Sequence, residues 1–175
     1  MPEPESVHLR RAEALARSRR PAAWASFPGG VCLGRRYEKL APMKPEPALR
    51  ETALAVPGVT RTADWEIRCR LLPEGEKIQN TPFTFAVACD TITKSTLVLR
   101  SRRAGDSLRL PAGHRSLRRL LMDRKVPAQL RDAVPVVADG AQVLAVGGIG
   151  VNLDFAAPAG GPAWEISLTN LKRKR

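Results

Sequence analysis

The chain has 175 residues, of which 43% are hydrophobic and 26% charged, and its formal net charge is +12 at pH 7. This composition is typical of a soluble globular protein with a buried core, and the longest apolar run, Val143 to Val151, is too short to span a bilayer. Residues 1–22 contain no hydrophobic stretch of the secretory kind, so we expect a cytoplasmic protein without a membrane partner.

The first half of the chain predicts one helix and a series of strands. Residues Glu5 to Arg19 alternate charged and apolar residues and favour a helix that ends before Pro21. A turn at Pro28-Gly29-Gly30 leads into a strand over Val31 to Tyr37, and the prolines between Ala41 and Pro47 indicate a connector. Turn residues bound three further predicted strands, Asp64 to Leu72, Phe83 to Cys89, and Thr96 to Arg100, and the first alternates around Trp65, Ile67 and Cys69.

A dense run of positive charge follows these strands. Between Arg100 and Arg131, ten basic residues face only Asp106 and Asp123, so this window carries +8 of the net charge of +12. Because leucines and valines recur among the charges, the run predicts a folded basic surface whose natural partner is a polyanion, with nucleic acid as the first candidate. The ten residues are Arg100, Arg102, Arg103, Arg109, Arg115, Arg118, Arg119, Arg124, Lys125 and Arg131.

A short helix lies within this run. Ser116 is a suitable N-cap, and three leucines then recur at helical spacing as a buried stripe. Three arginines with the same spacing point to another side, so the helix has an apolar face for the core and a guanidinium face for solvent or a ligand. The leucines are Leu117, Leu120 and Leu121, and the arginines are Arg115, Arg118 and Arg119.

The remaining elements are predicted to be mostly strands. Pro127 ends the helix or opens a second turn through Arg131. Val136 to Ala138 and Ala141 to Val146 flank Asp139-Gly140, a strong hairpin signal, and Trp164 to Leu168 indicates a last strand before a basic end. The whole pattern favours an α+β fold with a mostly antiparallel sheet and short helices.

The residue types offer little for catalysis or metal binding. Three widely spaced cysteines are typical of free thiols in a reducing compartment, and with only two histidines no paired zinc-ligand spacing occurs. No Ser/His/Asp or Cys/His set is evident, so we expect no catalytic residue, no metal site and no cofactor site in the chain. The cysteines are Cys32, Cys69 and Cys89.

Four polar or glycine-rich motifs have alternative interpretations. Gly147-Gly148-Ile149-Gly150 follows a strand, but no helix start comes after it to bind a phosphate, so a strand end is favoured. Asp106 is either a catalytic acid or a turn residue neutralised by neighbouring arginines, and the turn is favoured. Asp123-Arg124-Lys125 is either functional or a solvated helix end, and His114, in a predicted loop, could contact a phosphate.

Between Leu99 and Asn152 the sequence resembles the C-terminal domain of the tRNA(Ile)-lysidine synthase family. An Arg-x-Arg-x-x-Gly-Asp turn is followed by a Gly-containing loop, a basic helix, Asp-x-Lys-Val-Pro, an arginine and a Val-Pro hairpin. The matching positions are Arg100, Arg102, Gly105 and Asp106; Pro111 and Gly113; Ser116 to Leu121; Asp123, Lys125, Val126 and Pro127; Arg131, Val134 and Pro135.

Weaker similarity extends upstream, and none is evident beyond Asn152. It covers Phe27 to Gly30, Arg36 to Leu40, Val56 to Gly58, and Cys89-Asp90. The resemblance implies four segments, described as the end of a helical middle region (1–23), a β-rich middle or connecting region (24–95), the tRNA-binding domain (96–152), and a final strand with a basic tail (153–175).

The family resemblance implies a function in tRNA modification. The family couples lysine to the wobble cytidine of an isoleucine tRNA with a CAU anticodon, using ATP and magnesium in an N-terminal ATP-pyrophosphatase domain with a Ser-Gly-Gly-x-Asp-Ser loop. That loop does not occur here, since the Gly-Gly pairs at 29–30, 147–148 and 160–161 all lack it. We therefore expect the C-terminal, tRNA-recognising portion of the ligase, inactive without a catalytic domain.

The expected phosphate contacts lie on the basic segment. A different class of function remains open, namely a non-catalytic basic protein that binds RNA or another partner and has no role in modification. The candidate RNA-binding residues are Arg102, Arg103, Arg115, Arg118, Arg119, Arg124 and Lys125.

Overall fold

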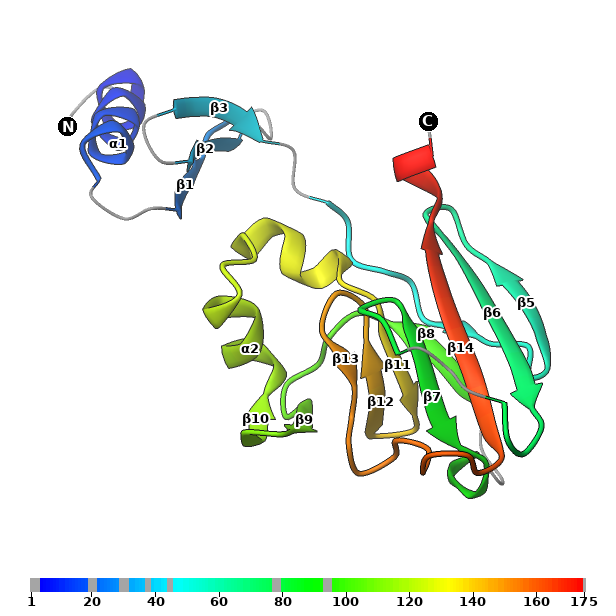
Figure 1. Cartoon of the computed structure of the whole chain (residues 1–175). Coiled ribbons are helices and arrows are strands. Elements are labelled where there is room, and N and C mark those ends of the chain that lie inside the picture. Colours follow the sequence, from blue (N-terminus) through cyan, green and yellow to red (C-terminus); the bar gives the residue numbers. More distant parts are fainter. Residues whose placement is uncertain are drawn as a thin grey trace.

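Antiparallel sheets dominate the fold, as Figure 1 shows for the computed structural model of the chain. The structure describes residues 4–18, 22–28, 32–36, 39–43, 46–76, 80–92 and 96–174. Helices are few and short beside these sheets, so the expected α+β class with a mostly antiparallel arrangement is confirmed. No helix in the described ranges is long and apolar enough to cross a membrane.

One helix and a three-stranded sheet form the N-terminal part (Figure 1). Helix α1 (Pro4–Arg17) confirms the expected helix, and its Leu15 is buried. Strands β1 (Ala22–Ser26), β2 (Cys32–Arg36) and β3 (Lys39–Met43) pair antiparallel in that order. The Arg35 guanidinium donates to the carbonyls of Ala16 and Ser18, which joins the sheet to the end of α1.

Strand β3 corrects the prediction of a connector over 41–47. Pro42 lies within β3 and is paired opposite Leu33 of β2. β3 has only one neighbour in its sheet, and an edge strand tolerates a residue without an N–H. The expected strand over 31–37 is confirmed for Cys32–Arg36, and Gly29 and Gly30 of the expected turn lie outside the described residues.

Two larger sheets pack face to face in the remainder of the chain (Figure 1). The five-stranded sheet has the order β13-β12-β11-β8-β4 and the four-stranded sheet the order β5-β6-β14-β7, all with antiparallel pairs. The strands of the first are β13 (Gly150–Val151), β12 (Gln142–Val146), β11 (Val136–Asp139), β8 (Leu97–Arg100) and β4 (Thr52–Ala53). Those of the second are β5 (Gly58–Arg61), β6 (Trp65–Leu72), β14 (Ala163–Asn170) and β7 (Thr84–Ala88).

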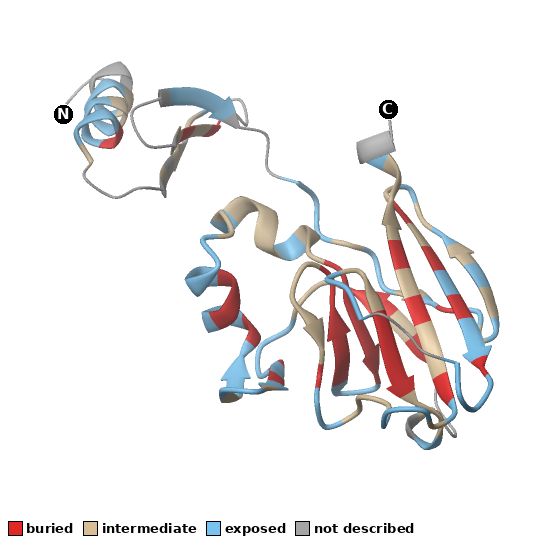
Figure 2. Ribbon diagram, in the orientation of Figure 1, coloured by how far each residue is buried: buried red, intermediate tan, exposed pale blue. Residues whose placement is uncertain are grey.

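The main core lies between these two sheets. Phe85, Leu99, Val137 and Ile166 belong to one buried cluster and are 0% exposed. Figure 2 shows buried residues along the facing strands of the two sheets. In β6, the predicted alternation around Trp65, Ile67 and Cys69 is the alternation of inward and outward side chains.

A third layer covers the other face of the five-stranded sheet. It consists of β9 (Ser107–Leu110), β10 (Gly113–Ser116), α2 (Leu117–Asp123) and the 3-10 helix η3 (Ala128–Ala133). The leucines of α2 pack with Val136, Ala138, Val143 and Val146, which lie on the sheet face opposite to the main core. The basic segment is thus anchored on a rigid sheet.

The predicted hairpin and glycine-rich strand end are also present. β11 and β12 pair with Asp139 opposite Gln142, so the turn is made by Gly140 and Ala141, one position later than expected. Gly140 has φ +56°, a conformation that favours glycine. Residues 147–149 form a turn between β12 and β13, with no helix after it, as the strand-end interpretation predicted. Short 3-10 helices occur at Cys89–Thr91 (η2) and Leu171–Lys174 (η4).

Candidate nucleic-acid interface

Helix α2 is fixed at both ends by its own sequence. The Ser116 hydroxyl accepts a hydrogen bond from the N–H of Arg119 at 3.4 Å, as the predicted N-cap requires. At the other end, Lys125 N–H donates to Met122 O and Val126 N–H donates to Leu121 O, each at 2.9 Å. This pair of bonds is the Schellman motif, and Lys125 occupies its left-handed position with φ 54°.

The two faces of α2 differ as the sequence predicts. Leu117, Leu120 and Leu121 are 1%, 7% and 1% exposed and pack on the sheet. Arg118 and Arg119 are exposed on the opposite side. A short helix held by three buried leucines therefore presents its guanidinium groups on a rigid support.

The other candidate residues lie around α2 on neighbouring elements. Arg102 and Arg103 are in the loop after β8, and Arg124 and Lys125 follow the last turn of α2. Arg115 belongs to strand β10 rather than to the helix, and its side chain reaches back to Asp123 at the end of α2, 3.5 Å away. We call the seven candidates together the basic surface: Arg102, Arg103, Arg115, Arg118, Arg119, Arg124 and Lys125.

Three members of the basic surface are paired with carboxylates. Arg102 Nε lies 2.9 Å from Asp132 Oδ1, and Arg103 forms an ion pair with Glu51, which lies in the segment before β4. Arg115 is paired with Asp123 as described. All of these partners are about half-exposed, with side-chain exposures of 47–52%.

The other four members have no acidic partner among the described residues. No ion pair is formed by Arg118, Arg119, Arg124 or Lys125 within the part of the chain that the structure describes. Arg124 instead donates from Nη1 to the carbonyl oxygen of Gly148 at 2.5 Å, which turns it towards the β12–β13 turn. The net positive charge is therefore concentrated on α2 and the two residues after it.

Arg100 corrects the interpretation of the ten basic residues as one surface. Its side chain is 2% exposed, and its Nη1 and Nη2 donate to Asp106 Oδ2 and Oδ1 at 2.8 and 2.9 Å. Asp106 also accepts from the Arg103 N–H at 2.6 Å, and its own carbonyl accepts from Leu117 N–H at 2.8 Å. Asp106 is thus a neutralised turn residue, the favoured alternative, and it fixes the loop of Arg102 and Arg103 to the start of α2.

Arg131 is close to the basic surface, although it was not among the candidate contacts. It lies in η3, is half-buried, and donates from Nε to Val126 O at 2.9 Å. Burial lowers the pKa of Arg131, and the nearby charges of Arg102 and Arg118 lower this pKa further, while Asp132 raises it. In the sequence, Arg131 is marked by its place in the basic run and as one of the positions that match the family.

The structure shows where two further polar residues with open interpretations lie. His114 lies in β10, not in a loop, with a side chain 65% exposed and Nε2 3.9 Å from Asp154 Oδ2. Asp123 is an exposed helix end paired with Arg115. Both residues therefore border the basic surface.

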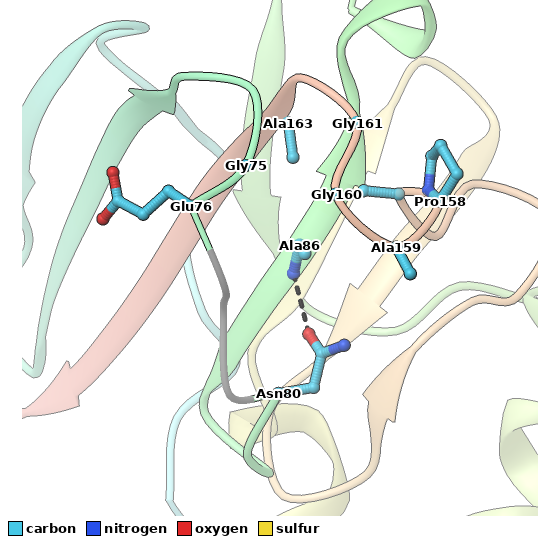
Figure 3. A pocket seen from close by; sticks show the side chains of 10 residues that line it. Gly75, Glu76, Asn80, Ala86, Pro158, Ala159, Gly160, Gly161 and Ala163 are labelled. Atoms are coloured by element: carbon cyan, nitrogen blue, oxygen red, sulfur yellow. Dashed lines mark hydrogen bonds between the residues drawn. The ribbon is translucent and has the colours of Figure 1, made fainter.

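A cavity lies apart from the basic surface, on the outer side of the four-stranded sheet. It measures about 620 Å³ and is lined mainly by small residues of the 157–161 loop, with Ala86 and Ala163 from the sheet and Glu76 and Asn80 from the 72–84 segment. Figure 3 shows the Asn80 side chain bonded to the backbone of Ala86, at 2.9 Å. Among its described lining residues there is no basic side chain.

The family resemblance implies magnesium-bound ATP for the complete enzyme. No group of three or more His, Cys, Asp or Glu side chains in the described ranges could hold a metal ion. The carboxylates beside the basic surface are dispersed and each is occupied by an arginine.

A comparison with protein families finds a match over the region that carries the basic surface. Residues 97–168 match the family described as TilS substrate C-terminal domain. This match extends past Asn152, where the sequence resemblance was expected to end, and includes most of β14. Strand β14 lies between β6 and β7 in the four-stranded sheet, so the matched region completes a sheet whose other strands precede it in sequence.

Curated relatives point to the same family. The tRNA(Ile)-lysidine synthase of Exiguobacterium sibiricum is 37% identical over 97 residues, covering 46% of this chain and 23% of the relative. That of Clostridioides difficile (strain 630) is 35% identical over 54 residues, covering 31% and 12%. That of Streptococcus sanguinis (strain SK36) is 39% identical over 59 residues, covering 34% and 14%. The matched part is less than a quarter of each relative's length.

A solved structure supports the fold. The crystal structure of a TILS C-terminal domain superposes with a TM-score of 0.60 at 23% sequence identity, covering 70% of this chain and 97% of that one. The two sheets with their covering layer are therefore a known arrangement.

Proposed function

We propose, since this chain resembles the C-terminal portion of tRNA(Ile)-lysidine synthase, that it is the tRNA-recognition part of that ligase, which attaches lysine to the wobble cytidine of an isoleucine tRNA with ATP. The observation that carries the proposal is the exposed, unneutralised charge of Arg118, Arg119, Arg124 and Lys125 within the matched domain. RNA phosphates are the chemical complement of such a surface.

The geometry of α2 suits contacts with a phosphate backbone. Arg118 and Arg119 project from a helix whose other face is buried, so their backbone is already ordered before RNA binds. Less conformational entropy is then lost on binding than with a disordered basic tail. Arginine adds the planar fork that can hold two phosphate oxygens at once.

The paired arginines can join the same interface at small cost. Arg102, Arg103 and Arg115 face half-exposed carboxylates, and ion pairs of this kind contribute little to stability because water and salt screen them. An RNA phosphate can therefore replace Asp132, Glu51 or Asp123 as the partner of the guanidinium. Up to seven phosphate contacts are available to the basic surface.

The bond-forming chemistry belongs, in this proposal, to a separate ATP-binding domain of the ligase. The described residues offer no metal-binding cluster, and the Ser-Gly-Gly-x-Asp-Ser loop does not occur in the sequence. We therefore expect the purified chain alone to form no lysidine. Incorporation of labelled lysine into tRNA by this chain and ATP would contradict that expectation.

Salt-dependent tRNA binding tests the proposal. With about five to seven phosphate contacts, a plot of log affinity against log salt should have a slope of about −4 to −6. Removing two contacts by the double change Arg118→Ala and Arg119→Ala should reduce the slope by about two and weaken binding. The matched control, Arg61→Ala with Arg68→Ala, removes the same charge from the outer face of the four-stranded sheet and should leave the slope almost unchanged.

The same titration addresses the alternative function. Isoleucine tRNA with a CAU anticodon should compete better than an unrelated structured RNA of equal length. Equal competition would favour a general RNA-binding protein with no role in modification. No binding to tRNA at low salt would refute a nucleic-acid interface altogether.

A further inference from the structure

The loop after β8 and the segment after α2 both contact η3. Arg131 Nε donates to the Val126 carbonyl at 2.9 Å, which ties η3 to the segment after α2. Arg102 Nε lies 2.9 Å from Asp132 Oδ1, which ties the loop after β8 to η3. The Ser101 hydroxyl donates to the Asp132 carbonyl, so the same loop is held a second time. Arg131 is therefore positioned by a hydrogen bond, and Arg102 by an ion pair with Asp132.

The charges at this junction are unbalanced. Arg118, from the first turn of α2, and Arg102 are both close enough to Arg131 to disfavour its charged form, and the nearby carboxylate is Asp132. Of these three arginines, only Arg102 forms an ion pair with Asp132. Arg131 is half-buried and only 29% of the Arg102 side chain is exposed, so water screens their repulsion less than it would on an open surface.

We infer that Arg102, Arg118 and Arg131 form one phosphate site, and that it receives a phosphodiester group of the RNA backbone. This inference rests on the proposed function and deepens it, because it names a contact, Arg131, outside the predicted set. With Nε committed to Val126, Arg131 keeps its two terminal nitrogens for an anion. A phosphate would replace mutual repulsion by charge-assisted hydrogen bonds from three elements.

The site differs in kind from the position of Arg119 alone. Arg119 is exposed on the helix and has no described ion pair, so a phosphate there would be held by one flexible side chain. At the junction, Arg131 is already positioned by its hydrogen bond to Val126 before binding. We therefore expect the junction to bind free inorganic phosphate measurably, whereas Arg119 contributes to RNA binding only.

Phosphate binding by the full chain and its variants tests the inference. Inorganic phosphate, titrated calorimetrically at constant ionic strength with chloride, should bind the unchanged chain. Arg131→Gln keeps a donor for the Val126 carbonyl but removes the charge, and it should weaken phosphate binding by about tenfold or more. Arg118→Gln, at an exposed position that folding does not need, should have the same effect. The matched control, Arg119→Gln, should bind phosphate within about twofold of the unchanged chain.

A melting curve separates a binding role from a structural one. If Arg131 were there for stability, Arg131→Gln would lower the melting temperature, whereas relief of like-charge repulsion predicts an unchanged or higher one without phosphate. Phosphate should also compete with tRNA more strongly than chloride of equal ionic strength, and Arg131→Gln should remove this difference. This competition experiment distinguishes a site for an RNA phosphodiester from a site for free phosphate only.

The outcomes distinguish the two proposals. If tRNA binds but phosphate binds all four proteins equally, or none of them, the junction site is refuted and the proposed function stands. If phosphate binds as expected but tRNA does not, the RNA source is refuted together with the proposed function. If Arg131→Gln fails to fold, Arg118→Gln decides, and full phosphate affinity in that variant overturns the site.

Discussion

Loss of the Asp106 carboxylate should destabilise the chain more than any change on the basic surface. The side chains of Arg100 and Asp106 are 2% and 4% exposed, and two hydrogen bonds of 2.8 and 2.9 Å join them. Asp106→Ala would leave the Arg100 guanidinium buried without its charge partner, and the Arg103 N–H would lose its acceptor as well. Breaking a buried pair in this way costs about 3–5 kcal/mol.

Urea and thermal unfolding would measure this cost. For a chain of this size, roughly 2–4 °C of melting temperature correspond to each kcal/mol, so Asp106→Ala should melt roughly 6–20 °C lower. The matched control is Glu165→Ala, which breaks a bidentate pair at 3.1 and 3.0 Å with Arg70, whose side chain is 49% exposed. Since water screens that pair, the control should leave the urea midpoint almost unchanged.

A second variant separates the effect of an unpaired buried charge from the effect of lost side-chain volume. Replacing both partners, Arg100→Met with Asp106→Leu, removes the buried charges together and should restore most of the stability lost in Asp106→Ala. A cost below about 1 kcal/mol for Asp106→Ala, or a double variant no more stable than the single one, would refute the reasoning.

Two further substitutions and the chemistry of Cys69 test the support of the basic surface and the core. Leu120→Ala should cost about 2–5 kcal/mol in urea unfolding because it opens a cavity beneath α2, and a normal melting curve would mean that the helix faces are reversed. Lys125→Gly should raise stability by about 1 kcal/mol, since glycine adopts φ 54° without strain, while tRNA affinity falls; an unchanged affinity would remove Lys125 from the interface. Burial raises the pKa of Cys69 to about 11, so at pH 8 iodoacetamide should modify the half-buried Cys89 well before Cys69 in a native sample followed by mass spectrometry. Because the unfolded chain would release this proton near its ordinary pKa of 9.0, stability should fall as the pH rises from 9 towards 11.

The elements that local sequence predicts well are those whose signals are themselves local. Ser116 and the leucine spacing define α2, and the structure shows the predicted cap and the predicted buried face. Gly140 likewise marks the β11–β12 turn. Strand β3 was missed because prolines weigh against a strand unless the strand is known to be an edge, which depends on the sheet order.

The basic surface was predicted by counting charged residues in the sequence, and such a count cannot show which way each side chain points. Arg100 belongs to the same run as Arg102 and Arg103, yet it ends β8 with its side chain directed into the fold towards Asp106. Arg131 stands 13 residues after Arg118 in sequence, and only the packing of η3 near α2 brings their charges together. Such long-range proximity has no sequence period, so it had to come from the structure.

The position of β14 also governs the order in which the chain can fold during synthesis. Its residues pair with β6 on one side, from Ala163 opposite Leu72 to Asn170 opposite Trp65, and with β7 on the other. β6 and β7 therefore have no common sheet until residues 163–170 have left the ribosome. Sheet pairings between residues so far apart in sequence form slowly, and until then two strand edges are open to pairing with other chains. For this fold, the interval before the last strand emerges is the one in which a nascent chain is most exposed to aggregation.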